Sequence, residues 1–286
     1  MNYNTLPARF TVTPLALLVP IASLALVSAF ASAEDITVNS SGLFLVYQDE
    51  GIENIIVPSA SEIFSNNEFS FISIVESRAS SIANEGHIIG KKTISVEDRG
   101  DVAQDGVVVT TVGSIANSGT ISVLSGSTTG SFGISIDDGA QVGIIANSGT
   151  ILANDGEFIG IGSIGIEVFN RATVDSITNE GTIKVASGIV VSDIGSAVED
   201  ITNSGTISMF GSNPTPSGSS SFGISIDKMA QVGSITNTGT ISCVTSNECE
   251  NRNSIEVRNG AIVNSITNEG ELDFAKIEVS DFGTTV

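Results

Sequence analysis

One seven-residue motif, Ile-x-Asn-x-Gly-Thr-Ile, recurs along the chain and constrains its fold more than any other feature. A motif that returns at intervals of a few tens of residues is typical of stacked repeats, in which each unit buries its apolar face against its neighbours. Complete copies begin at Ile115, Ile145, Ile177, Ile201 and Ile235, and degenerate copies begin at Ile82 and Ile266.

A second motif, Gly-Ile-x-(Ile/Val), precedes most of these copies. From its first Ile to the next repeat Asn there are 13 residues in four cases, 14 in a fifth and 23 in a sixth. From that Asn to the next such Ile the count varies between 9 and 21 residues. One half of each repeat is therefore fixed in length, whereas the other half carries insertions. The shortest complete repeat, 179–203, spans 24 residues from Asn to Asn, which fits one coil of a parallel β-helix with three short strands.

The alternation of apolar and polar residues predicts which side chains face the core. The motif Asn falls on an inward position, where stacked asparagines every ~4.8 Å can pass amide hydrogen bonds along the coils. We assign the Gly that follows to the bend between two strands. The predicted inward set includes Ile115, Ile121, Val123, Ile134 and Ile136, and the outward set includes Ala116, Ser118, Thr120, Ser122, Ser135 and Asp137. The predicted asparagine ladder comprises Asn84, Asn117, Asn147, Asn179, Asn203, Asn237 and Asn268.

The composition agrees with this fold, because the chain is rich in Ile, Val, Thr, Asn and Gly, has no Trp, and is only 15% charged. We expect an all-β, right-handed parallel β-helix of about seven coils, one for each motif copy. The β-helix repeats occupy residues 81–286. The stretch 34–80 lacks the motif, and we interpret it as an N-terminal cap or an irregular first coil.

Residues 1–33 have the features of a signal peptide: Arg9, then an apolar stretch, then Ala31-Ser32-Ala33 as a cleavage site. An uncleaved membrane anchor is the alternative, although Pro14 and Pro20 break the apolar run. All 32 acidic residues and ten of the 11 basic ones follow Ala33, so the mature chain carries a net charge near −22. Such a charge disfavours nucleic acid as a partner.

Two cysteines, Cys243 and Cys249, lie close together near the end of the array. An exported protein meets oxidising conditions, so we expect a disulfide that closes one short loop. A metal pair is the alternative reading, but no His lies nearby, and we expect neither a metal nor a cofactor.

The repeat Ile-Thr-Asn-Ser-Gly-Thr-Ile, with Gly-Ile-x-Val between copies and a signal peptide ahead, resembles passenger domains of bacterial autotransporters. The resemblance covers Ile82 to Val279. It implies export across the inner membrane and display at the outer surface through a C-terminal translocator barrel. The present sequence has no barrel-like segment, so that barrel is expected to be supplied elsewhere or lost. We expect a monomeric, structural or adhesive protein whose partners are host or cell-surface glycans or proteins.

The insertions are the first candidates for a binding site, since loops carry the function of many repeat proteins. Four of them, 125–132, 154–163, 211–222 and 245–253, follow the Gly-Thr-Ile strand and should leave the coil at one corner; flexible decoration is the competing interpretation. The long segment between Ile94 and Asn117 contains Arg99-Gly100-Asp101, which looks like the integrin-binding tripeptide. A tripeptide also arises often by chance.

Enzymatic β-helices exist, so we considered catalytic side chains. Glu256 and Glu278 fall on equivalent outward positions of successive coils, near the separation used by retaining glycosidases. Arg258 and Lys276 neighbour them and no aromatic platform is evident, so we interpret them as part of a solvated acidic face. No Ser/His/Asp set is expected around His87, the single histidine. An outward threonine column suits exposed strands, and regular threonine arrays can also bind ice or accept sugars. This column contains Thr120, Thr150, Thr182, Thr206 and Thr240.

The sequence thus predicts an exported, surface-exposed β-solenoid without catalytic activity, structural or adhesive in function. A polysaccharide-binding or polysaccharide-degrading β-helix is the alternative.

Overall fold

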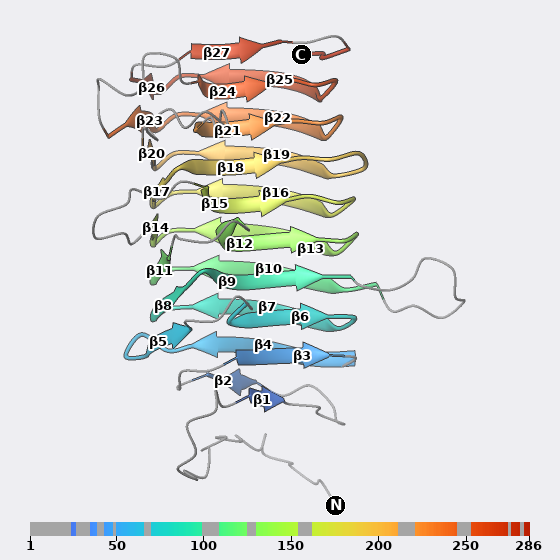
Figure 1. Cartoon of the computed structure of the whole chain (residues 1–286), viewed down its shortest axis with the longest axis vertical. Helices are drawn as coiled ribbons and strands as arrows, with labels where there is room; N and C mark the ends of the chain where they lie inside the picture. Colours follow the sequence, from blue (N-terminus) through green and yellow to red (C-terminus); the bar gives the residue numbers. More distant parts are fainter. Residues whose placement is uncertain are drawn as a thin grey trace, which may run out of the picture.

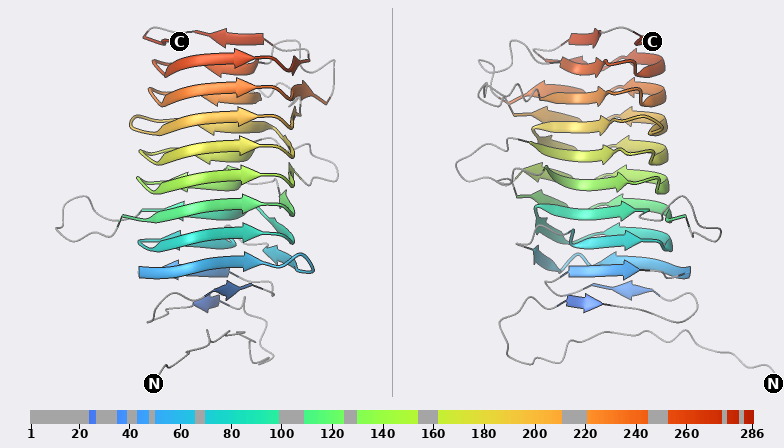
Figure 2. Two further views of the ribbon diagram at one scale, coloured as in Figure 1. Left: turned by 180° about the vertical axis from the view of Figure 1, so that it is seen from behind. Right: turned by 45° about the vertical axis from the view of Figure 1, so that its right-hand side comes forward.

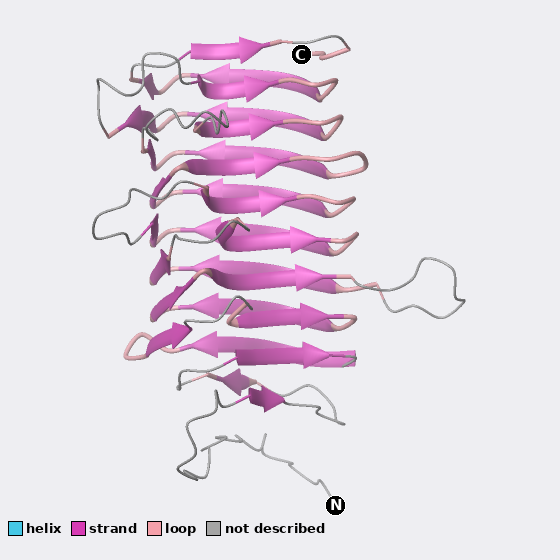
Figure 3. Cartoon of the chain, in the orientation of Figure 1, coloured by secondary structure: helices cyan, strands magenta, loops and turns pink. Residues whose placement is uncertain are grey.

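The computed structural model describes residues 24–26, 35–38, 43–47, 50–65, 70–98, 109–124, 130–153, 162–210, 221–244, 253–273, 276–280 and 283–286. In these residues the chain contains strands and turns but no helix, and all its strand pairs are parallel (Figure 3). The strands stack into a right-handed parallel β-helix, and the coils follow one another along the long axis of the molecule (Figure 1). The predicted fold class is therefore confirmed.

Three sheets form the walls of the β-helix, and we call them A, B and C. Within the described residues they contain ten, nine and eight strands, respectively. Sheet A consists of β1 (Leu24–Leu26), β3 (Leu43–Tyr47), β6 (Ile72–Val75), β9 (Lys92–Glu97), β12 (Ser131–Asp137), β15 (Ser163–Val168), β18 (Ser187–Val191), β21 (Phe222–Ile226), β24 (Asn253–Val257) and β27 (Lys276–Val279).

Sheet B consists of β2 (Ile36–Thr37), β4 (Glu50–Val57), β7 (Arg78–Asn84), β10 (Thr111–Asn117), β13 (Gln141–Asn147), β16 (Thr173–Asn179), β19 (Ala197–Asn203), β22 (Gln231–Asn237) and β25 (Ile262–Asn268). Sheet C consists of β5 (Glu62–Ser65), β8 (His87–Gly90), β11 (Thr120–Val123), β14 (Thr150–Ala153), β17 (Thr182–Val185), β20 (Thr206–Met209), β23 (Thr240–Cys243) and β26 (Glu271–Leu272). Each coil runs from sheet A to sheet B to sheet C, and sheet B forms a continuous stack of parallel strands (Figure 2, left).

The repeat motif sets the register, because equivalent residues pair from coil to coil. Ile145 pairs with Ile115 in the preceding coil and with Ile177 in the next, and Asn147 pairs with Asn117 and Asn179 in the same way. The inward isoleucines of all three sheets are fully buried in the middle of the stack, as Ile115, Ile121 and Ile134 show with 0% exposure. The core is therefore a set of stacked aliphatic columns, confirming the predicted inward set.

The corner between sheets A and B is a tight turn that we did not predict, although two of its copies contain the turn signals Asp138-Gly139 and Asn259-Gly260. Four of these turns close with a hydrogen bond between a backbone carbonyl and the N–H three residues later, which belongs to Ala140, Ala172, Ala230 or Ala261. Their central residues have positive φ, as in the hairpin-type turns that favour Asn-Gly. Each alanine has 0% exposure, so a small side chain enters the core where the wall bends.

The corner between sheets B and C contains the motif glycine, and the structure corrects the reason for it. These glycines do not have positive φ. At Gly149 an added Cβ would collide with the carbonyl oxygen of Gly119 in the preceding coil, and Gly181 meets Gly149 in the same manner. Glycine is required because the backbones of successive coils approach closely here.

The stretch 34–80, which we expected to be a cap or an irregular first coil, contributes strands to all three sheets. Its strands β4, β6 and β5 pair with β7, β9 and β8 of the following coil, respectively. Ile55 and Ile63 take the places of the motif isoleucines, with 0% exposure. The stacked coils therefore extend beyond the seven motif copies, because the inward positions need only apolar side chains and not the motif itself.

Candidate functional site

The predicted asparagine ladder is continuous in the structure. Each side-chain amide donates to the Oδ1 of the next asparagine at 2.7 Å, from Asn84 through to Asn268. Val57 occupies the ladder position in the preceding coil, and Oδ1 of Asn84 accordingly has no hydrogen-bond donor. The ladder satisfies buried amides along the stack, so its role is structural.

Several other predicted residues lie outside the described part of the chain. These are Arg99, Gly100 and Asp101 of the tripeptide, and most of each of the four insertions. The strand order nevertheless places all four insertions between a sheet C strand and the next sheet A strand, so they leave at one corner. Cys243 ends β23 and is disulfide-bonded, whereas Cys249, its expected partner, lies outside the described residues.

The threonine column occupies equivalent positions at the start of five consecutive sheet C strands. Thr120, Thr150, Thr182, Thr206 and Thr240 pair directly with one another, each partly exposed. His87 continues the column at one end and Glu271 at the other. The column is one residue wide, because the next outward position holds side chains as different as Leu152 and Lys184.

The structure corrects our view of the glutamate pair at the end of sheet A. Glu256 and Glu278 do face each other in register, but Glu256 is 6% exposed and does not belong to a solvated face. Its Oε1 accepts a hydrogen bond from Asn253 at 2.9 Å, and its Oε2 lies 3.2 Å from Nε of Arg258. Burial raises the pKa of Glu256, while Arg258 opposes that shift. Both oxygens are thus occupied by partners within the protein, which is a structural arrangement.

A second acidic group lies on the outward face of sheet A. Burial, reinforced by the charge of Asp138, raises the pKa of Asp137 to about 6. Burial and the nearby charges of Asp137 and Asp193 raise the pKa of Glu167 to about 7, despite opposing contributions from two lysines. Like charges that share a partly desolvated surface favour protonation. These carboxyls make the folded state sensitive to pH near neutrality.

His87 has a partner that sequence reasoning missed. Its Nε2 lies 2.8 Å from Oγ of Ser122, and the two residues belong to neighbouring sheet C strands 35 positions apart in sequence. Ser122 was expected to point outward into solvent, but it is only 2% exposed. Its strand, β11, pairs with β8 on one side and with β14 on the other, so the pair lies within a continuous sheet.

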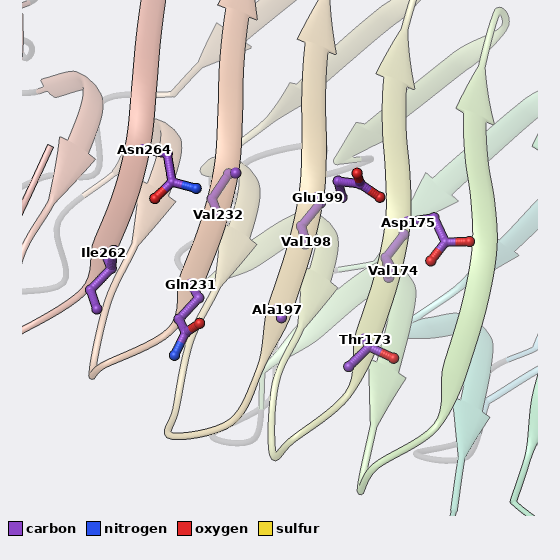
Figure 4. A pocket seen from close by; sticks show the side chains of 11 residues that line it. Thr173, Val174, Asp175, Ala197, Val198, Glu199, Gln231, Val232, Ile262 and Asn264 are labelled. Carbon is purple, nitrogen blue, oxygen red and sulfur yellow. The ribbon is translucent and has the colours of Figure 1, made fainter.

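A shallow groove crosses four strands of sheet B, parallel to the long axis (Figure 4). The first three residues of β16, β19 and β22 line it, together with Ile262 and Asn264 of β25. We call it the sheet B groove. Valines 174, 198 and 232 point into the core, so the residues before and after them form its surface. The groove was not predicted, because its residues come from four repeats and share no motif.

Four polar side chains of the sheet B groove are available to a ligand. Asp175, Glu199, Gln231 and Asn264 are exposed and, in the described part of the chain, make no side-chain hydrogen bond. Elsewhere on the same sheet exposed polar groups pair with each other, as Ser234 does with Asp200 at 2.5 Å. No lysine or arginine lines the groove. It therefore offers carboxylate and amide groups without a neutralising cation.

Among the described residues there is no cluster of three or more His, Cys, Asp or Glu side chains that could hold a metal ion. The same residues contain no helix long and apolar enough to cross a membrane. Family models, curated proteins and solved structures were all compared with the chain, and none of the three comparisons gave a match.

Proposed function

We propose that this protein is an exported bacterial β-helix of the autotransporter-passenger type, with a structural or adhesive role at the cell surface. The observation that carries the proposal is the continuous stacking of parallel strands in three sheets, which gives an elongated scaffold (Figure 1). The predicted signal peptide over residues 1–33 and the disulfide-bonded Cys243 both favour an oxidising compartment outside the cytoplasm. The high negative charge keeps such a rod soluble and monomeric.

Adhesion is assigned to the corner between sheets C and A. The four insertions leave the coils at this corner, where loops can vary without disturbing the ladder or the core. Host or cell-surface proteins and glycans are the partners that such loops would contact.

A second function, polysaccharide binding, is favoured by the sheet B groove. Its exposed carboxylates and amides are the groups that bind sugar hydroxyls, and none of the four makes a side-chain hydrogen bond to another described residue. We do not propose hydrolysis. Glu256 is ion-paired to Arg258, with its Oε2 3.2 Å from Nε of the arginine.

The proposal is tested by expressing the full chain, with its own leader, in a Gram-negative host. We expect cleavage after Ala33, recovery outside the cytoplasm, and an intramolecular disulfide in the mature protein. Beads coated with residues 34–286 should adhere to cell-surface extracts, and no reducing ends should be released from polysaccharides. Retention in the cytoplasm with an intact leader, or steady glycan turnover, would contradict the proposal.

A further inference from the structure

The sheet B groove has a repeat that matches a polymer. It runs across β16, β19, β22 and β25, so each coil contributes the same two surface positions, the first and third residues of the strand (Figure 4). Coils repeat every ~4.8 Å, which is close to the length of one unit in an extended β-linked polysaccharide. A linear chain lying along the groove can therefore present one sugar to each coil.

The lining suits sugar hydroxyls along its whole length. Asp175 and Glu199 project from adjacent coils, followed by Gln231 and then Asn264. All four side chains are planar and polar, so each can exchange two hydrogen bonds with neighbouring hydroxyls. Gly233 leaves the surface open in the third coil, and Ile262, 39% exposed, offers an apolar patch to a ring face in the fourth. The combination of a few polar groups and an apolar contact is typical of sites for small organic ligands.

The charge of the groove selects among polysaccharides. Two carboxylates one coil apart, with no basic side chain in the lining, repel uronic acids and sulfated sugars. The net charge of −21 on the whole chain acts in the same direction. An uncharged polymer meets no such barrier.

We propose that the sheet B groove binds a neutral, linear, β-linked polysaccharide along the axis of the β-helix, without cleaving it. This inference rests on the second of the proposed functions and names its ligand class and its contact residues. Recognition uses the side chains of Asp175, Glu199, Gln231 and Asn264, one from each coil.

The test is a titration of the mature chain, residues 34–286, with cellohexaose, followed by NMR of backbone amides and isoleucine methyl groups. We expect saturable shifts at the groove, including the Ile262 methyl groups. Gln231→Ala should weaken binding about fivefold or more, and Asp175→Ala combined with Glu199→Ala about tenfold or more. The matched control is Gln141→Ala, an exposed glutamine at the equivalent position of β13 that lies outside the groove; it should bind as the unchanged chain does.

Maltohexaose, which is neutral but α-linked and curved, and hexagalacturonate, which is anionic, should bind at least about tenfold more weakly. The inference is overturned if cellohexaose causes no saturable shifts, if the shifts lie elsewhere, or if Gln231→Ala and Gln141→Ala have equal effects. Equal binding of hexagalacturonate would also overturn it. None of these results bears on export or adhesion, so a failure here is distinguishable from a failure of the proposed surface function.

Discussion

Replacing one asparagine in the middle of the ladder should destabilise the fold far more than replacing the first one. Asn179 accepts from Asn147 and donates to Asn203, both at 2.7 Å, and is fully buried. Asn179→Ala removes both hydrogen bonds and leaves a buried amide donor and a buried carbonyl acceptor poorly satisfied. Each of these two groups costs about 1–3 kcal/mol, so the free energy of unfolding should fall by about 2–6 kcal/mol.

Asn84→Ala should cost much less. Asn84 makes a single ladder bond, to Asn117, and its own Oδ1 already lacks a donor. The substitution leaves Oδ1 of Asn117 without its donor, but it also removes the unsatisfied Oδ1 of Asn84. We therefore expect the free energy of unfolding to fall by about 1–2 kcal/mol. The contrast between the two variants isolates the ladder from the general cost of truncating a buried side chain.

Equilibrium urea unfolding of residues 34–286, with the disulfide intact, measures both losses. Thr178→Ala, the adjacent outward residue of β16, is the control and should change stability by less than about 0.5 kcal/mol. Native-state hydrogen exchange at the flanking amides would show whether coils open locally. Equal losses at Asn179 and Asn84, or a loss at Asn179 no larger than at Thr178, would refute the reasoning.

Three further predictions follow from individual side chains. The raised pKa of Glu167 means that its protonated form stabilises the fold below pH 4.5 and that this stabilisation, on the order of 3 kcal/mol, is lost as the pH rises through 7. Glu167→Gln should therefore flatten the pH dependence of the urea midpoint between pH 4 and 8; an unchanged slope would contradict this. Ser254→Ala should stabilise by about 1 kcal/mol in urea unfolding, because this buried hydroxyl has no hydrogen-bond partner among the described residues; a loss would count against it. Met229→Gly should raise stability by about 1 kcal/mol, because Met229 has a φ of 64° where the next coil has Gly260, and an unchanged melting temperature would argue otherwise.

The features that the sequence predicted are those in which one residue type is required in every coil. The ladder requires Asn, and the close approach of backbones at its corner requires Gly. Both residues therefore recur in the sequence as a motif whose copies can be counted. The inward isoleucine columns follow from the same alternation. Coils that have other residues at these positions do not match the motif. The first coils were not predicted for this reason, because Val57 stands in place of the ladder Asn.

The remaining features depend on contacts between coils or on backbone geometry. His87 meets Ser122 only because the register brings residues 35 positions apart together. The groove arises from four unlike triplets at the start of four strands. The turns between sheets A and B have positive φ at Arg171 and Met229, residue types that give no turn signal. The alternation of inward and outward positions likewise did not predict that the outward Ser135 is buried, with 1% exposure.

The central claim is that coils stack in one register, and paired cysteines test it most directly. Thr178 and Thr202 are register partners in adjacent coils, whereas Thr178 and Thr236 are two coils apart. Their Cα separations should be ~4.8 Å and ~9.6 Å, so only the first pair lies within the limit of about 7 Å for a disulfide. Mild oxidation of Thr178→Cys/Thr202→Cys should give an intramolecular cross-link, and Thr178→Cys/Thr236→Cys should give none. A cross-link in the second variant, or its absence in the first, would contradict the stacked register on which the groove and the ladder depend.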